Sequence, residues 1–203
     1  MRKILIVGDS FSANWSVKFK DYLGWPDLLA RNYDVTNMSQ AGVSEYKIMK
    51  QLSLVGNVKQ FDYVIISHTC PYRVNTRRHP VHCNDSLHKN ADLIYSDINY
   101  HAGRLLGWLN RSLISAKSFF VHHFDMEYQE IVYQLIKNEI AKITYGVPTI
   151  SLINRNVPDM FIEHQDINLT QIQLDNQGHI NHLSKEGNII VYNIIKEHIK
   201  SLG

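Results

Sequence analysis

Ser10 and His182, near opposite ends of the chain, are the residue types of a catalytic nucleophile and its base. Ser10 follows the apolar run 4–7 and the turn formers Gly8 and Asp9. A serine hydroxyl is a weak nucleophile at neutral pH and needs a base within hydrogen-bond reach. His182 precedes a helical pattern at the end of the chain, so its loop can fold back toward Ser10. The two residue types therefore predict a reaction in which the serine oxygen attacks a carbonyl carbon. The structural alternative is that Ser10 is only the N-cap of a helix.

Strand-like and helix-like patterns alternate along the chain and would position these residues. The strand-like segments are residues 4–7, 33–39, 61–67, 118–124 and 147–153. The helix-like segments are residues 24–32, 41–52, 126–146 and 183–203. This alternation predicts an α/β protein, a three-layer α/β/α sandwich with a parallel sheet of about five strands. Ser10 would then lie at the carboxyl end of the first strand, the edge at which open α/β sheets bind ligands.

Composition limits the class of protein. The chain has 203 residues, of which 44% are hydrophobic, enough for one sizeable core and a single domain spanning 1–203. The formal net charge of +2 gives no reason to expect a nucleic-acid partner. Two cysteines are too few for a disulfide framework, which favours a reducing compartment. The sequence shows no signal peptide and no apolar stretch of membrane-spanning length, so we expect a cytoplasmic protein with no membrane partner.

One segment, at about residues 71–99, departs from the alternation. It is polar, rich in histidine and arginine, and without a clear period. Long irregular segments inside a compact domain are usually functional or mobile. Because the segment leaves the carboxyl end of the third expected strand, it would cover the same edge of the sheet as Ser10. Two interpretations stay open: a substrate-facing lid, whose Arg73 binds an anionic group of the substrate, and a surface insertion.

Several histidines and cysteines in and near this segment are of metal-ligating types. They are Cys70, His79, His82 and Cys83. Their spacing matches no zinc pattern, so we predict no metal and no other cofactor. His122 and His123 fall at the end of the strand-like segment 118–124, and we expect packing or solvent contacts for them.

Three short motifs occur in the order that one known family shows. GDSFS at 8–12 follows the first strand, NMSQAGVS at 37–44 contains a glycine after the second strand, and NHLSKEGN at 181–188 places a histidine before the last helix. Together they resemble the first, second and last blocks of the SGNH (GDSL-type) hydrolases, which are serine esterases and lipases with a flavodoxin-like sheet. From the first motif to the last, they span nearly the whole chain. The resemblance implies a divergent member of that family.

The resemblance also implies a role for each matching residue. Ser10 would be the nucleophile and His182 its base, and the N–H groups of Ser10 and Gly42 would bind the oxyanion. In the family's third block an asparagine side chain completes this oxyanion hole, whereas the corresponding stretch here reads SHTC. Thr69 stands at the asparagine position and would donate from its hydroxyl. From the residues themselves, we expect the neighbouring His68 and Arg73 to contact the substrate, and either is an alternative donor in place of the missing asparagine.

The last block lacks the family's usual acid. The family has an aspartate three residues before the histidine, and His179 stands there in this chain. We predict a dyad of Ser10 and His182 in which His179 orients the base. Two alternatives stay open: Asp175 curls back to form a displaced triad, or a backbone carbonyl fixes the tautomer of His182.

These residues predict a serine ester hydrolase that cleaves an acyl or acetyl ester through an acyl-enzyme. Its substrate would be a small-molecule ester or an ester on a carbohydrate. An O-acyltransferase would use the same residues, with a sugar hydroxyl in place of water. The alternative from a different class is a non-catalytic binding module that keeps the fold.

Overall fold

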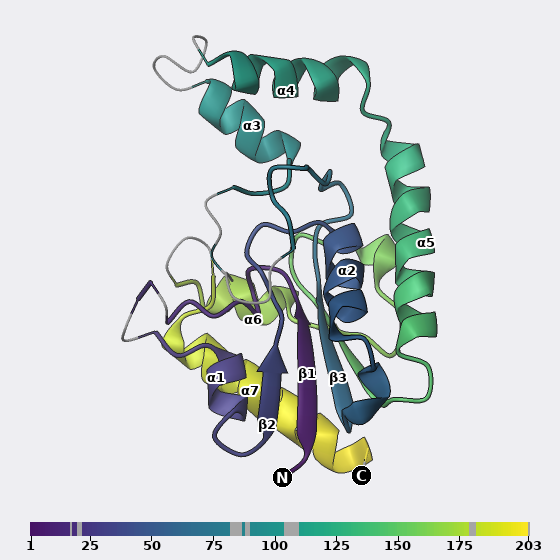
Figure 1. Cartoon of the computed structure of the whole chain (residues 1–203). Helices are drawn as coiled ribbons and strands as arrows, with labels where there is room; N and C mark the ends of the chain where they lie inside the picture. Colours follow the sequence, from purple (N-terminus) through teal and green to yellow (C-terminus); the bar gives the residue numbers. More distant parts are fainter. Residues whose placement is uncertain are drawn as a thin grey trace.

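A sheet of parallel strands lies between two layers of helices (Figure 1). The computed structural model describes residues 1–16, 18–19, 22–81, 87, 90–103, 110–178 and 182–202. In the order of the sheet, the strands are β2 (Asp34–Asn37), β1 (Lys3–Gly8), β3 (Tyr63–His68), β4 (Thr149–Ile153) and β5 (Ile167–Asn168). All neighbouring strands pair in parallel. The expected three-layer α/β/α sandwich with about five parallel strands is confirmed.

Helices cover both faces of this sheet. The α-helices of the described residues are α1 (Trp25–Leu29), α2 (Glu45–Val55), α3 (Tyr95–Ala102), α4 (Arg111–His122), α5 (Met126–Ile143), α6 (Thr170–Asp175) and α7 (Lys185–Leu202). Side chains of α1 and α7 pack on one face, and side chains of α2 and α5 pack on the other. The helices α3 and α4 pack on each other and extend away from the sheet (Figure 1).

The central strands β1 and β3 are apolar and buried on both faces, which is typical of parallel strands between helical layers. Ile4 and Ile6 belong to the core under α1 and α7. Leu5 and Val7 belong to the core under α2 and α5. Because this packing fixes the strands in register, the carboxyl ends of β1, β3 and β4 lie side by side. Polar residues that follow these strands are therefore gathered at one edge of the sheet.

Residues 118–122 of the segment 118–124 are helical, and the segment does not form the strand that its aromatic and β-branched residues predict. It forms the end of α4, whose N-cap Asn110 accepts hydrogen bonds from two N–H groups of the first turn at 3.1 and 3.3 Å. Phe120 packs against α3, so this segment buries one helical face instead of alternate residues. His122 and His123, expected at a strand end, lie instead at the end of α4. The fifth strand of the sheet is instead the two-residue β5, which no pattern in the sequence indicates.

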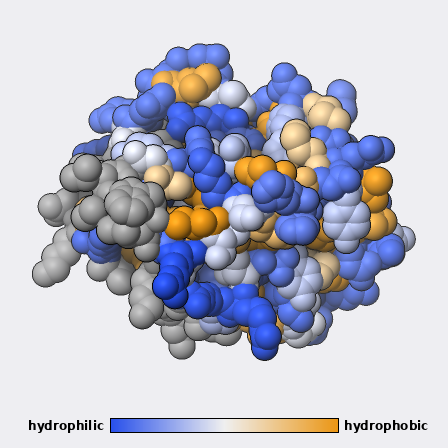
Figure 2. Space-filling model, turned by 90° about the horizontal axis from the view of Figure 1, so that it is seen from above, coloured by the Kyte–Doolittle hydropathy of each residue, from blue (hydrophilic) through white to orange (hydrophobic). Residues whose placement is uncertain are grey.

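The surface over the carboxyl ends of the strands mixes hydrophobic and hydrophilic side chains. Seen from above, patches of both kinds alternate across this face (Figure 2).

No helix in the described ranges is both long enough and apolar enough to span a membrane.

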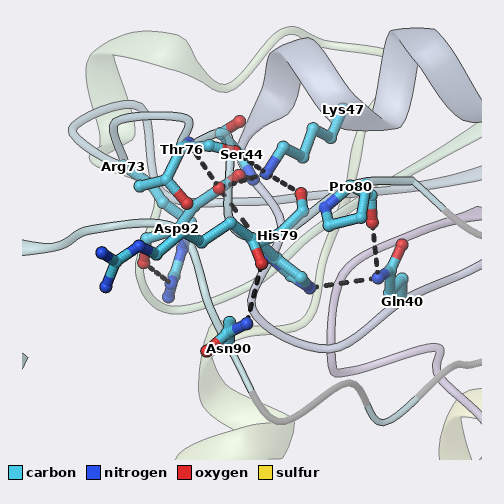
Figure 3. A network of polar contacts seen from close by, with 10 residues as sticks. Gln40, Ser44, Lys47, Arg73, Thr76, His79, Pro80, Asn90 and Asp92 are labelled. Atoms are coloured by element: carbon cyan, nitrogen blue, oxygen red, sulfur yellow. Dashed lines mark hydrogen bonds and ion pairs between the residues drawn. The ribbon is translucent and has the colours of Figure 1, made fainter.

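A buried ion pair fastens the segment 71–99 to the body of the protein (Figure 3). Lys47 of α2 pairs with Asp92 and also donates to the carbonyl oxygens of Thr76 and His79. Asp92 accepts a further hydrogen bond from the N–H of Thr76 at 2.8 Å. Burial raises the pKa of Asp92, but the nearby His79 ring, Lys47 and the N–H groups of Thr76 and Ser44 together outweigh burial and lower it below its ordinary value. The charged carboxylate is thus held in place by the surrounding donors.

Lys47→Met is expected to destabilise the protein by about 3–5 kcal/mol, because it leaves the buried carboxylate of Asp92 without its cation. The two side chains are only 6% and 0% exposed, so solvent does not replace the lost partner. The free energy of unfolding in urea measures the effect. Lys50→Met, at an exposed position of the same helix, is the control and is expected to change stability by less than about 0.5 kcal/mol. Equal effects in the two variants would contradict this role of the ion pair.

Candidate active site

Ser10 lies half-buried in the turn that follows β1, at the carboxyl edge of the sheet. Just before it, the N–H and the carbonyl of Gly8 pair with the side-chain amide of Gln51 at 2.8 and 3.0 Å. Just after it, the indole N–H of Trp15 donates to the carbonyl oxygen of Ser10 at 2.7 Å. These hydrogen bonds fix the backbone on both sides of the Ser10 hydroxyl.

His182 lies beside this turn, although it comes from the other end of the chain. Its ring contacts the rings of Phe11 and Trp15, with centroids 5.1 and 4.6 Å apart. Phe11 is the next residue after Ser10, and Trp15 holds the Ser10 carbonyl. The neighbouring Leu183 is buried in the core and anchors the loop that carries the histidine. The structure therefore brings together the two segments that hold the candidate nucleophile and the candidate base.

Two side chains, His179 and Asp175, are the candidates for orienting the base His182. His179 lies outside the described residues. Asp175 is exposed at the end of α6, where its carboxylate accepts a hydrogen bond from Gln171 Nε2 at 2.8 Å. The carboxylate is thus engaged on its own helix, and the structure does not bring it to His182.

Asp9, the residue before Ser10, is a buried carboxylate at the centre of a polar cluster. The groups that donate to it are Phe11 N–H (3.0 Å), Ser67 Oγ (3.3 Å), Asn154 Nδ2 (3.3 Å) and the hydroxyl of Thr69. Burial raises the pKa of Asp9 to about 6, although the hydrogen bond from Phe11 and the charge of Arg73 act against the shift. Carboxylates with shifted pKa values are found preferentially at functional sites.

Sequence reasoning missed Asp9 and Asn154 as members of this site. Asn154 directly follows β4, and its Nδ2 donates both to Asp9 and to the carbonyl of His68, at 3.3 and 2.6 Å. The signal was present, because a polar residue directly after a buried strand falls at the ligand-binding edge of such a sheet. Ser10 holds the corresponding position after β1.

We expect the titration of Asp9 to lower stability between about pH 4 and pH 6. The carboxyl has its ordinary pKa of 3.8 in the unfolded chain and about 6 in the folded protein. The folded state therefore holds one more proton in this window, and the free energy of unfolding falls as pH rises. The full difference, about two pKa units, is on the order of 3 kcal/mol, present below the window and lost above it. Urea unfolding across this pH range measures the fall.

Asp9→Asn should flatten this part of the pH dependence, whatever it does to the absolute stability. Asp175→Asn removes an exposed carboxyl and should keep the wild-type slope. A wild-type slope in Asp9→Asn would show that Asp9 does not titrate in this window.

Thr69 and His68 are both buried and already bond to partners inside the protein. Thr69 is 1% exposed; its N–H donates to Glu45 Oε2 at 3.1 Å, and its hydroxyl bonds to Asp9. His68 is 2% exposed, with Nδ1 2.6 Å from Glu45 Oε1 and Nε2 3.4 Å from Ser151 Oγ. These partners place His68 on the α2 and α5 face of the sheet. The structure therefore does not bring the His68 side chain to the turn after β1.

Gly42 lies under the segment 71–99 with a φ of +75°, a conformation that favours glycine. A Cβ atom at this position would come within 2.6 Å of the Cβ of Ala91. The N–H of Asp92 donates to the Gly42 carbonyl at 2.8 Å, and Arg73 Nη1 donates to the Asp92 carbonyl at 3.1 Å. The backbone of the second candidate oxyanion donor is thus packed directly against this segment.

The candidate metal ligands form no metal site in the described part of the chain, where no three His, Cys, Asp or Glu side chains gather. Cys70 is buried and free, and His79 belongs to the polar network of Figure 3. His82 and Cys83 lie outside the described residues.

Two solved structures of ester-cleaving enzymes resemble this one. The esterase EstA from Pseudoalteromonas sp., inhibited by monoethylphosphonate, matches with a TM-score of 0.51 and 13% sequence identity, over 100% of this chain and 98% of EstA. A lipase/acylhydrolase from Enterococcus faecalis matches with a TM-score of 0.42 and 16% identity, over 99% and 96% of the two chains. No protein-family model matches the sequence, and no curated protein matches it significantly. The chain therefore shares its three-layer α/β/α fold with the esterase EstA.

Proposed function

We propose that the chain is a serine ester hydrolase that forms an acyl-enzyme on Ser10. The contact of the His182 ring with Phe11 and Trp15 carries the proposal, because it sets a base beside the turn that holds the nucleophile. The turn lies at the carboxyl edge of an open α/β sheet, where such folds bind their ligands. The fold shared with an esterase supports the same activity.

In the proposed reaction His182 accepts the hydroxyl proton of Ser10 while the serine oxygen attacks the ester carbonyl. The N–H groups of Ser10 and Gly42 stabilise the oxyanion of the tetrahedral intermediate. Protonated His182 then gives its proton to the leaving alcohol, and the acyl group stays on Ser10. Water, deprotonated by the same histidine, attacks the acyl-enzyme and releases the carboxylic acid.

Thr69 takes a different role from the oxyanion donor that its place in the third block implies. Its hydroxyl bonds to the Asp9 carboxylate and it is almost fully buried, so we assign it to holding the turn before Ser10. Asn154 holds the same carboxylate from β4. With no asparagine side chain at the oxyanion, we propose a two-donor hole, and removal of one oxyanion donor typically costs about a hundred- to a thousandfold in rate. We therefore expect modest turnover. His179 remains the proposed neighbour that orients His182.

Hydrolysis of 4-nitrophenyl acetate by the full chain tests the proposal. We expect saturable release of 4-nitrophenolate, because an acetyl ester is a small acyl donor with a good leaving group. Protein unfolded by heat is the control for hydrolysis by solvent and by surface histidines. Turnover no faster than this control would count against the enzyme and favour the non-catalytic binding module.

A further inference from the structure

A cavity of about 380 Å³ opens between the first turn of α2, the start of the segment 71–99 and the junction of α4 and α5. Its volume falls within the range of small-molecule binding sites. The described residues that line it come from these three elements and do not include Ser10 or His182.

Three residues that line this cavity each hold a buried polar atom with no hydrogen-bond partner among the described residues: Ser44 Oγ, Arg73 Nε and Tyr133 OH. The side chains of Ser44 and Tyr133 are only 2% and 1% exposed. Ser44 is the N-cap of α2, yet its hydroxyl does not cap the helix. Native proteins pair nearly all buried polar groups, so three such atoms on one wall indicate that a ligand completes them.

All three atoms can donate a hydrogen bond to the same ligand. Arg73 keeps its positive charge, and its Nη1 is already held by the Asp92 carbonyl at 3.1 Å. Burial raises the pKa of the Tyr133 hydroxyl well above its ordinary value, and the charge of Glu45 adds to the shift. The hydroxyl therefore stays protonated. The first turn of α2 adds N–H groups that have no intrahelical acceptor and the positive end of the helix dipole. These donors together favour an anionic ligand.

The other residues that line the cavity indicate the net charge of the ligand and the kind of group that is attached to its anionic end. The apolar residues among them are Phe119, Phe124, Tyr128, Val132 and Ile136. Two carboxylates, Glu45 and Asp125, also line the cavity. The oxygens of Glu45 lie against His68 Nδ1 and Thr69 N–H, and Asp125 caps α5. One cation beside two carboxylates suits a ligand with a single negative charge better than a dianionic phosphate.

We propose that this cavity binds a small carboxylate that carries an apolar or aromatic group. The carboxylate accepts hydrogen bonds from Arg73 Nε and from the hydroxyls of Ser44 and Tyr133. The apolar group packs on Phe119 and Phe124. The proposal is independent of the Ser10 chemistry, because the cavity and the turn after β1 are different sites.

Calorimetric titration of the full chain with benzoate tests the proposal. We expect saturable binding of one benzoate per chain, and no binding of the neutral benzamide at the same concentrations. Tyr133→Phe and Ser44→Ala should each weaken benzoate binding about tenfold, because each removes one hydrogen bond to a charged group. Neither should lower the melting temperature, since each removes a hydroxyl that has no partner in the free protein. Tyr145→Phe, which removes the hydroxyl of an exposed tyrosine outside this cavity, is the matched control and should bind benzoate as the wild type does.

Ser10→Ala separates this site from the proposed active site, where a carboxylic acid would bind as a product. We expect it to bind benzoate with wild-type affinity. Loss of binding in Ser10→Ala, or full affinity in both Tyr133→Phe and Ser44→Ala, would overturn the proposal. So would equal affinity for benzamide, tighter binding of phenyl phosphate, or no benzoate binding by the wild type.

Discussion

Ser10→Ala is expected to lower kcat for 4-nitrophenyl acetate by at least about a thousandfold, because the variant has no oxygen to form the acyl-enzyme. The turn itself should persist, since Gln51 holds the backbone before the serine and Trp15 holds the carbonyl after it. Neither contact uses the Ser10 hydroxyl. Initial rates over a range of substrate concentrations measure the loss in kcat.

Ser16→Ala is the matched control for this variant. It removes the hydroxyl of a half-buried serine in the same loop, where that hydroxyl donates to Asn14. We expect its kcat to stay close to that of the wild type, and both variants to unfold at temperatures close to the wild-type value. Unchanged turnover in Ser10→Ala would remove Ser10 from the mechanism.

His182→Ala is expected to lower kcat by at least about a thousandfold as well, because Ser10 then has no base to take its proton. The alanine also vacates the space between Phe11 and Trp15 that the imidazole ring fills. Free imidazole in the assay should therefore restore part of the activity, which a merely unfolded variant would not show. The rate at increasing imidazole concentration is the measurement.

Asp175→Ala and His179→Ala distinguish the dyad from a displaced triad. Asp175→Ala should keep nearly full activity, because its carboxylate is exposed and bound to Gln171. His179→Ala should lose part of the activity and keep a measurable remainder, since a neighbouring histidine orients the base without balancing its charge. If Asp175→Ala is as damaging as His182→Ala while His179→Ala is silent, the triad is correct and the dyad is wrong.

The layers of the fold could be predicted from the sequence because burial leaves a strong pattern. The run at 4–7 is buried on both faces of β1, which only a continuous apolar segment tolerates. The long helical pattern at 126–146 corresponds to α5, which Asp125 begins with a side-chain hydrogen bond to the N–H of Tyr128.

Two elements could not be predicted, for different physical reasons. The segment 118–124 has strand-forming residue types, but it continues a helix that Asn110 begins and that packs on α3 through Phe120. Tertiary packing overrides intrinsic preference in such a segment. The strand β5 has only two residues, Ile167 and Asn168, too few to show any period.

The candidate site was predictable in its location and not in its detailed contacts. Strand ends indicated where Ser10 would lie, and the motif before the last helix indicated His182. Successive side chains along a strand point to opposite faces of the sheet. Ser67 reaches Asp9, whereas His68, one residue later, reaches Glu45 on the opposite face. A shift of one residue therefore separates a member of the site from a core residue.

Labelling with a fluorophosphonate, followed by mass spectrometry of the peptides, tests the central claim most directly. The reagent forms a covalent bond to a serine oxygen only where a base activates the hydroxyl. We predict one adduct on the folded wild-type protein, on the peptide that contains Ser10, and no adduct in His182→Ala or in heat-unfolded protein. A folded wild-type protein that stays unlabelled, or an adduct on a different serine, would contradict the assignment of Ser10 as an activated nucleophile.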